Sequence, residues 1–443
     1  MKHTIYVLTI IGLLFGCKKT EYVPKFDELP QERVQKDIKE LKTSLAGSTN
    51  GWIGVMPTLS GGGYGFYITF AADESMMMQA DLDTTKALNA NKSFYRVKQD
   101  MGINLIFDTY NYISMLNDPE PSVFGGAIRD GFKSDIEFTF DSAQGDTLSF
   151  LGKRYRQPLI LVKANAAQKT KYDNGGYKAL MKSIYQFFID NPNSYVNVGN
   201  TKVGVVVNSS NSLSAGKRVE LSAIIQDGSV VASKQKFAYT IDGITVLNGG
   251  VGLLGVTFNR FAWKNNTQLA MYDTKNQEYI INNNATPLLP LYKLWGSKYT
   301  GMYSEFRTIY PGTSPAGRDT LNYFHENMLN GFTGYVFNYG DLELVWNTVN
   351  NRLTINGFSS QNGGNSGWVT SGSLNYTIDN NGVYTFTVQS AMAGGYVSKA
   401  MTKLWNFFLN NRVSFDYYVD NADVYAKVSS VNDPTTVMTF ELY

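Results

Sequence analysis

Cysteine is almost absent from the chain, because Cys17 is the only one among 443 residues. One thiol cannot form an internal disulfide, so the folded part must be stabilised by a buried core rather than by covalent cross-links. A chain of this length can bury such a core in two or three domains. The single thiol also disfavours a zinc site, which draws on several cysteine and histidine ligands.

Histidine is nearly as scarce, with only His3 and His325 in the whole chain. His3 belongs to an N-terminal apolar segment, and His325 stands in a Tyr-Phe-His-Glu run that has no evident nucleophile beside it. Nucleophilic catalysis by serine or cysteine needs a base next to the nucleophile. The sequence therefore predicts no catalytic residue and no cofactor, and it favours a satisfied surface or cleft position for His325.

Charge is sparse and evenly balanced, with only 17% of residues charged. Removal of residues 1–16 takes away one lysine, which leaves 38 Lys and Arg against 37 Asp and Glu. A protein that binds nucleic acid usually concentrates basic residues on one face. We therefore expect no nucleic-acid partner.

An apolar run from Ile5 to Phe15 follows Lys2 at the start of the chain. This order is typical of a secretory signal peptide, and the run is shorter than the roughly 20 apolar residues that span a bilayer. The stretch Leu14-Phe15-Gly16-Cys17 resembles the cleavage box of bacterial lipoproteins. We predict a lipoprotein signal peptide over residues 1–16, a lipid on Cys17 and a polar tether over residues 17–27.

Several acyl chains on one cysteine would make a permanent membrane anchor, since each buried methylene contributes about 0.8 kcal/mol. The residue after Cys17 is a lysine and not the aspartate that retains lipoproteins in the inner membrane. The resemblance therefore implies a cell-envelope protein on the outer membrane, facing the periplasm or the surface.

Aromatic residues and glycine are abundant, with 29 Tyr, 26 Phe and 41 Gly. This mixture favours β-sheet with tight turns. In Gly63–Phe70 the apolar residues alternate, as on one face of a strand. Closely spaced strands of this kind indicate antiparallel sheet. Further strands are predicted at 94–97, 104–108, 136–140, 147–151, 159–162, 195–198, 203–207, 219–225, 237–241, 334–339, 342–346, 353–355, 383–388, 413–419 and 437–442.

Helical spacing of apolar residues appears near 30–46, 177–189 and 396–409. We predict a mainly β fold with a few helices (α+β), built as two antiparallel β-sandwich or open-barrel domains with an amphipathic helix packed on each. The Asn- and Pro-rich segment Asn282–Pro290 is the predicted linker. It separates an N-terminal β-rich part over 28–285 from a C-terminal β-rich domain over 291–443.

Carboxylates provide two weak candidate sites. Asp81 and Asp83 occupy alternate positions and offer oxygen ligands to a cation, although the glycine and distant glutamate of an EF-hand loop are missing. A glycosidase needs two carboxylates across one cleft, about 5 to 10 Å apart. The candidates for such a pair are Asp108, Asp135, Glu137, Glu305 and Glu343.

Several stretches together resemble an uncharacterised family of Bacteroidetes envelope lipoproteins that share a domain of unknown function. The most specific stretch is Phe107-Asp108-Thr109-Tyr110-Asn111. The others are Gly51-Trp52, Gly62-Gly63-Tyr64, Ser93–Val97, Asp135–Phe138, Gly152-Lys153, Asp242–Ile244 and Phe261–Trp263. The resemblance implies a lipid anchor and genes near outer-membrane uptake systems for glycans or peptides, and it implies no catalytic residue.

The candidate binding residues within these stretches are Trp52, Tyr64, Asp108, Tyr110 and Asn111. Side chains of the 107–111 run either line a pocket or satisfy the amides of a turn after a strand, and the second interpretation is favoured.

Three functions fit the sequence. The first is a non-enzymatic binding or accessory component of a nutrient uptake system, with a glycan, a peptide or an outer-membrane transporter component as partner. The second is a carboxylate-based hydrolase, and the third is a structural or adhesive surface protein. Two carboxylates in one cleft would favour the hydrolase, whereas a large exposed apolar patch would favour adhesion.

Overall fold

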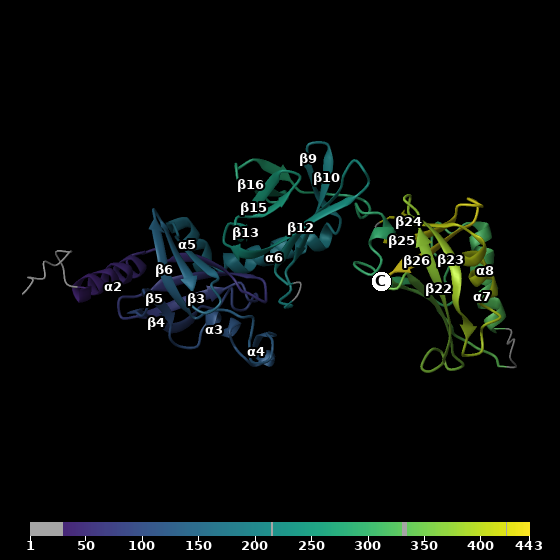
Figure 1. The fold of residues 1–443 in the computed structure, drawn as a ribbon, viewed down its shortest axis with the longest axis horizontal. Helices are drawn as coiled ribbons and strands as arrows, with labels where there is room; N and C mark the ends of the chain where they lie inside the picture. Colours follow the sequence, from purple (N-terminus) through teal and green to yellow (C-terminus); the bar gives the residue numbers. More distant parts are fainter. Residues whose placement is uncertain (1–29, 214–215, 330–334, 422) are drawn as a thin grey trace, which may run out of the picture. The chain divides into compact units, whose positions relative to one another are not determined.

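The computed structural model describes residues 30–213, 216–329, 335–421 and 423–443 (Figure 1). The predicted signal peptide, Cys17 and the tether lie outside this part of the chain. The described residues confirm a mainly β fold of antiparallel sheets with a few helices. Within them, no helix is both long and apolar enough to cross a membrane.

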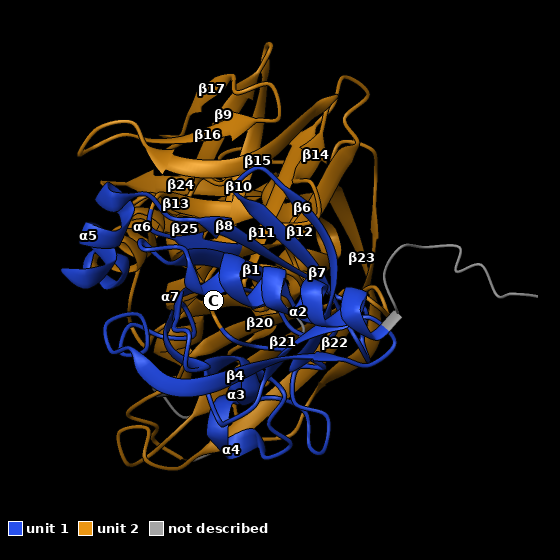
Figure 2. Cartoon of the chain, turned by 90° about the vertical axis from the view of Figure 1, so that its left-hand side faces the viewer, with its two compact units in different colours: residues 1–178, 211–216, 238–241 blue, residues 179–210, 217–237, 242–443 orange. Residues whose placement is uncertain are grey.

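The chain divides into two compact units (Figure 2). Unit 1 contains residues up to 178 together with 211–216 and 238–241, and unit 2 contains 179–210, 217–237 and 242–443. The predicted linker lies inside unit 2. It begins with the short strand β18 (Asn282–Asn283) and continues without a further strand or helix to Pro290.

Eight strands form a closed antiparallel barrel in unit 1, because β1 pairs with β2 on one side and with β8 on the other. Aromatic and aliphatic side chains fill its core. Both faces of β2 are nearly completely buried. The strands are β1 (Trp52–Pro57), β2 (Gly63–Phe70), β3 (Ser75–Ala80), β4 (Asn91–Gln99), β5 (Ile103–Phe107), β6 (Glu137–Gln144), β7 (Thr147–Gly152) and β8 (Pro158–Lys163).

The predicted helix at residues 30–46 is α2 (Pro30–Ala46). It packs on the barrel through Leu41 and Leu45, which are buried in the barrel core. The remaining helices that begin in unit 1 are α3 (Tyr112–Leu116), α4 (Pro121–Phe124), α5 (Ala166–Asp173) and α6 (Gly176–Asp190). Helix α6 matches the helix predicted at 177–189.

A second sheet follows in the order β17-β16-β15-β13-β12-β11-β10-β9-β18, with β14 paired to β15. One segment, Glu278–Asn283, supplies both ends of this order, because it pairs with β16 at its start and with β9 at its end. The strands are β9 (Ser194–Val198), β10 (Thr201–Asn208), β11 (Arg218–Ile224), β12 (Val230–Thr240), β13 (Gly243–Val246), β14 (Val251–Leu253), β15 (Val256–Trp263), β16 (Leu269–Asp273) and β17 (Glu278–Ile280).

The end of β12 packs within unit 1, against residues that are distant in the sequence. The Tyr239 amide donates a hydrogen bond to Asp81 Oδ2 at 2.7 Å, and the Tyr239 carbonyl accepts one from the Tyr177 hydroxyl at 2.8 Å. The Ile241 amide donates to the Tyr172 hydroxyl at 3.0 Å. These buried bonds attach residues 238–241 to the outside of the first barrel.

The C-terminal part of unit 2 forms another closed antiparallel barrel, β19–β26. Trp295 and Trp346 stack in its core with ring centroids 3.9 Å apart. Its strands are β19 (Gly301–Ser304), β20 (Leu342–Asn347), β21 (Arg352–Ser359), β22 (Trp368–Ile378), β23 (Val383–Ala393), β24 (Val413–Asp420), β25 (Asp423–Ser430) and β26 (Val437–Leu442), and its helices are η1 (Leu291–Lys293), α7 (Pro315–Leu329) and α8 (Thr402–Asn410).

Two sequence predictions are wrong in this barrel. The strand expected at 334–339 is absent from its described residues, where only Tyr339 forms an isolated bridge with Ser360. This segment is irregular instead, with Phe337 buried against Tyr396 while Tyr335 is exposed. The helix expected at 396–409 begins only at Thr402. The Gly394-Gly395 pair in left-handed backbone conformation leads into a turn before it.

Candidate functional site

Trp52 and Tyr64 lie in the core of the first barrel, and both are fully buried. The Trp52 indole donates a hydrogen bond to the Leu45 carbonyl at 2.9 Å, which fixes α2 to β1. The Tyr64 ring meets Phe124 and Phe132 edge to face. We therefore assign both side chains to packing and not to ligand contact.

The 107–111 run forms the turn between β5 and α3. Asn111 Oδ1 accepts hydrogen bonds from the Ile113 and Ser114 amides at 2.9 and 3.1 Å, as a helix N-cap does. Asp108 forms an ion pair with Arg96 on the neighbouring strand. Asn111 thus satisfies turn amides as the favoured interpretation predicts, whereas Asp108 pairs with a side chain instead.

Tyr110 is the exposed member of the run, with 57% of its surface accessible. Its hydroxyl donates to Asp118 Oδ2 at 2.7 Å. Desolvation, followed by this contact with the carboxylate, raises the pKa of Tyr110 to about 12. The hydroxyl thus stays protonated and holds the turn in place.

Asp81 and Asp83 bind main-chain amides. Asp81 accepts the hydrogen bond from Tyr239 described above, and Asp83 Oδ1 accepts from the Thr85 and Lys86 amides at 2.8 Å each. In the described residues, no three His, Cys, Asp or Glu side chains gather in a way that could hold a metal ion. Asp83 therefore stabilises a local turn, whereas Asp81 holds the distant segment 238–241.

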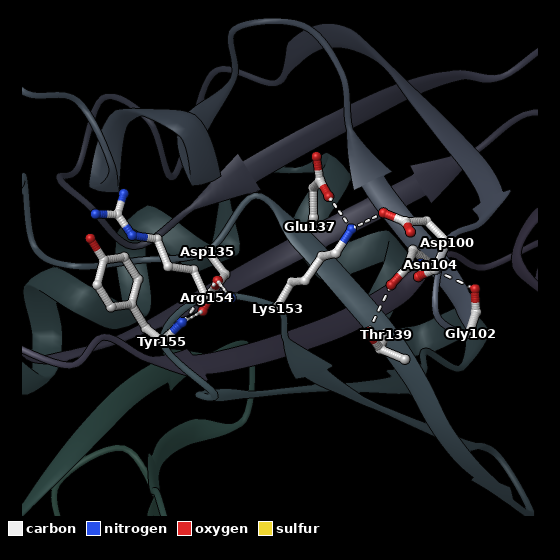
Figure 3. Close-up of polar contacts among 9 residues, drawn as sticks. All are labelled: Asp100, Gly102, Asn104, Asp135, Glu137, Thr139, Lys153, Arg154 and Tyr155. Carbon is white, nitrogen blue, oxygen red and sulfur yellow. Dashed lines mark hydrogen bonds and ion pairs between the residues drawn. The ribbon is translucent and has the colours of Figure 1, made fainter.

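Asp135 and Glu137 line one small pocket of about 280 Å3 in unit 1. Figure 3 shows Lys153 reaching between Glu137 and Asp100. The Lys153 ammonium lies 3.3 Å from Glu137 Oε2 and also pairs with Asp100. These bonds, the one to Asp100 first, raise the pKa of Lys153. Glu137 is therefore held as an ion-paired carboxylate.

Asp135 is only 4% exposed, and it clamps the turn after β7 (Figure 3). Its Oδ1 accepts hydrogen bonds from the Arg154 and Tyr155 amides at 2.6 and 3.2 Å. Burial raises the pKa of Asp135, although these amides oppose the shift. A Cβ on Gly152 would lie 2.1 Å from the carboxylate, so this turn requires a glycine there. The matching Asp135–Phe138 and Gly152-Lys153 stretches thus share one structural explanation.

Glu305, Glu343 and His325 lie in the C-terminal part of unit 2. Glu343 accepts hydrogen bonds from Asn356 Nδ2 and the Tyr443 hydroxyl at 3.0 and 2.7 Å. His325, on α7, is 3% exposed and touches Phe306 and Phe324 edge to face. Glu305 follows β19, and its carbonyl accepts a hydrogen bond from the Thr308 amide at 3.0 Å.

A groove of about 1080 Å3 lies in unit 2. Its lining comes from the second half of α6, the turn that joins β15 to β16, and the β17–β18 segment. Six of its side chains are amides and two are aromatic. The lining residues are Ser183, Gln186, Phe187, Asp190, Asn191, Trp263, Lys264, Asn265, Asn266, Thr267, Gln268, Ile280, Ile281 and Asn282.

Trp263 is held in the groove by α6. Its indole N–H donates a hydrogen bond to Ser183 Oγ at 3.1 Å, and its ring meets Phe187 at a centroid distance of 5.6 Å and an angle of 89°. The turn beside it is also ordered, because Asn265 Oδ1 accepts hydrogen bonds from the Thr267 and Gln268 amides at 2.9 and 2.8 Å. The groove is therefore preformed.

The groove was not among the sites predicted from the sequence. The polar run Lys264–Gln268 between two apolar strands was a signal for an exposed turn, but nothing in the pattern placed α6 beside it. Asn282 was assigned to the linker, whereas it pairs with β9 and lines the groove.

The fold and this groove define a class. It is a β-rich protein with two antiparallel barrels and a further sheet, β9–β18, beside which lies a preformed groove lined by amides and aromatic rings. The chain belongs to the family described as a domain of unknown function (DUF4302), whose family model matches residues 24–265. The match includes the first barrel and α6, and it ends inside the turn after Trp263. No curated protein matches the chain.

Proposed function

We propose that this protein binds a nutrient ligand without chemically changing it, as a lipid-anchored accessory component of an uptake system at the cell envelope. The groove of unit 2 is the single observation that carries the binding role, because it is large, preformed and lined by convergent polar groups around two aromatic rings. The lipoprotein-like stretch at Cys17 supports the anchor, as does the resemblance to Bacteroidetes envelope lipoproteins.

Binding should depend on the groove. A soluble form that begins at Lys18 keeps every described residue and can be titrated against glycans and peptides. Gln186→Trp places a bulky ring in the groove from an exposed position of α6, and we expect it to weaken binding at least tenfold. Lys182→Trp is the matched control, because Lys182 is exposed on the same helix and does not line the groove. Equal binding by both variants would refute the assignment.

The anchor should depend on one atom, the Cys17 sulfur. We expect Cys17→Ala to shift the full-length protein from the membrane fraction to the soluble fraction, because the acyl chains would have no attachment point. Fractionation with and without detergent, together with labelling by a palmitate analogue, measures this. A Cys17→Ala protein that still sediments with membranes would show that another feature holds it there.

A carboxylate-based hydrolase is the second candidate, and the shared pocket of Asp135 and Glu137 is the observation in its favour. Both groups already have partners. Asp135 accepts hydrogen bonds from two backbone amides, and Glu137 forms an ion pair with the Lys153 ammonium. A general acid must carry a proton that it can release to substrate. Burial raises the pKa of Asp135 in that direction, but its carboxylate oxygens already accept hydrogen bonds from the Arg154 and Tyr155 amides and so are not directed at a substrate. If the protein hydrolysed one of the tested glycans or peptides and Glu137→Gln abolished this hydrolysis, the enzyme would be favoured over the binding protein.

A further inference from the structure

The chemistry of the groove lining narrows the class of ligand. Its six amide side chains are Gln186, Asn191, Asn265, Asn266, Gln268 and Asn282. An amide offers both donors and acceptors, which matches a hydroxyl group that is itself donor and acceptor. Asn266 makes no hydrogen bond within the described residues, so its amide can serve a ligand without breaking an internal bond. The groove is therefore suited to a ligand with many hydroxyl groups.

The charges of the lining are few and already engaged. Asp190 Oδ1 accepts a hydrogen bond from Gln186 Nε2 at 2.7 Å. Lys264 lies 2.6 Å from Glu278 Oε1 and pairs with it. With one acid and one base among the lining residues, the groove offers no net charge to a charged ligand. This balance favours an uncharged ligand over a polyanion.

Trp263 provides an aromatic surface in the same groove. The face of an indole carries negative partial charge, and the C–H face of a pyranose ring is apolar with positive partial charge, so the two stack favourably. The bond to Ser183 Oγ and the Phe187 contact hold the indole before any ligand arrives. Less conformational entropy is therefore lost when a ring stacks on it.

The backbone beside the groove disfavours an extended peptide. Peptides commonly bind by adding a strand to a free sheet edge. Here the segment Glu278–Asn283 pairs with β16 at its start and with β9 at its end. Both terminal strands of the sheet are therefore already paired with this segment beside the groove. The ligand must be recognised by side chains, and these are amides rather than apolar pockets.

We infer that the groove binds an uncharged oligosaccharide, with one sugar ring stacked on Trp263 and hydroxyl groups bonded to the surrounding amides. A volume of about 1080 Å3 accommodates several sugar rings rather than one. This inference rests on the proposed binding function and adds the ligand class.

The test uses the soluble form from Lys18 on an array of neutral glycans and on a peptide library, followed by calorimetry with the strongest binders. We expect a neutral oligosaccharide to bind, Trp263→Ala to weaken it at least tenfold, and Trp263→Phe to keep part of the affinity, because phenylalanine retains an aromatic face. Trp368→Ala is the matched control, since Trp368 is 40% exposed on β22 and lies outside the groove. It should leave the affinity unchanged.

The outcomes separate the two claims. If a peptide binds, Gln186→Trp abolishes this binding and no glycan binds, the saccharide assignment is overturned but the binding function stands. If no glycan and no peptide binds, the binding function itself is overturned. Saccharide binding that survives Trp263→Ala and Gln186→Trp places the site elsewhere and overturns the inference. Circular dichroism of each variant confirms that it is folded.

Discussion

Gly65→Ala is expected to destabilise unit 1 by about 3 kcal/mol or more. A Cβ at position 65 would lie 1.9 Å from the Tyr239 carbonyl oxygen and 2.7 Å from the Tyr177 hydroxyl. Both atoms belong to the buried bond that attaches residues 238–241 to the barrel. Because a carbonyl oxygen of the main chain cannot rotate away as a side chain can, the segment must detach or β2 must shift.

Urea denaturation followed by circular dichroism measures the free energy of unfolding, and hydrogen exchange locates the loss in peptides from β2 and residues 236–242. Gly252→Ala is the matched control. Gly252 is also a strand glycine without left-handed backbone conformation, but its Cβ would meet its nearest neighbour at an ordinary 3.5 Å. If the two variants were equally stable, the packing of residues 238–241 against β2 would be wrong.

Acid is expected to destabilise the protein through His325, by at most about 3 kcal/mol. Burial, and then the Arg307 guanidinium, lower the pKa of His325 from 6.5 to about 4. Nδ1 accepts a hydrogen bond from the Arg307 amide at 3.5 Å, and Nε2 has no partner among the described residues. A proton on this imidazole would therefore be buried beside a second positive charge and without an acceptor.

The direction of the pH effect follows from the two protonation states. Between about pH 6.5 and pH 4, His325 is protonated in the unfolded chain but not in the folded chain. The contribution of His325 to the free energy of unfolding is therefore fully present above pH 6.5 and decreases as the pH falls toward 4. Below pH 4 this contribution is constant. Carboxylate titrations add to the same curve, so a variant is needed to separate them.

His325→Gln provides that separation, because it keeps a polar side chain but cannot titrate. We expect the wild-type protein to lose about 3 kcal/mol more than the variant between pH 7.5 and pH 4. His325 is the one histidine in the chain from Lys18 onward, so a single imidazole resonance in NMR reports its pKa directly. An imidazole that titrates near pH 6.5, or parallel stability curves, would contradict its burial.

Local pattern was sufficient for the fold class and for elements with a regular period. The alternation in Gly63–Phe70 and the helical spacing at 30–46 predicted β2 and α2, because a strand or helix with a buried face repeats its apolar residues at a fixed interval. The pattern was misleading at 334–339, since Phe337 is buried there while Tyr335, two residues before it, is exposed.

The 107–111 run shows how much a local motif can reveal about a site. Its Asp108 and Asn111 were predicted to satisfy turn amides, and the structure places Asn111 at the N-cap of α3, where it accepts hydrogen bonds from the Ile113 and Ser114 amides. Side chains that bond to amides a few residues away obey rules of sequence spacing. Trp52 and Tyr64 could not be assigned in this way, because burial depends on the whole barrel.

The amino-acid order alone was enough to propose the lipid anchor at Cys17, to exclude an internal disulfide and to predict a mainly β chain, since each depends on residue identity or short-range spacing. Closure of the barrels, capture of residues 238–241 by Asp81 and Tyr177, and the groove around Trp263 depend on contacts between distant segments. Such contacts leave no fixed interval in the sequence, because the length of chain that joins two touching residues is not constrained by the contact itself.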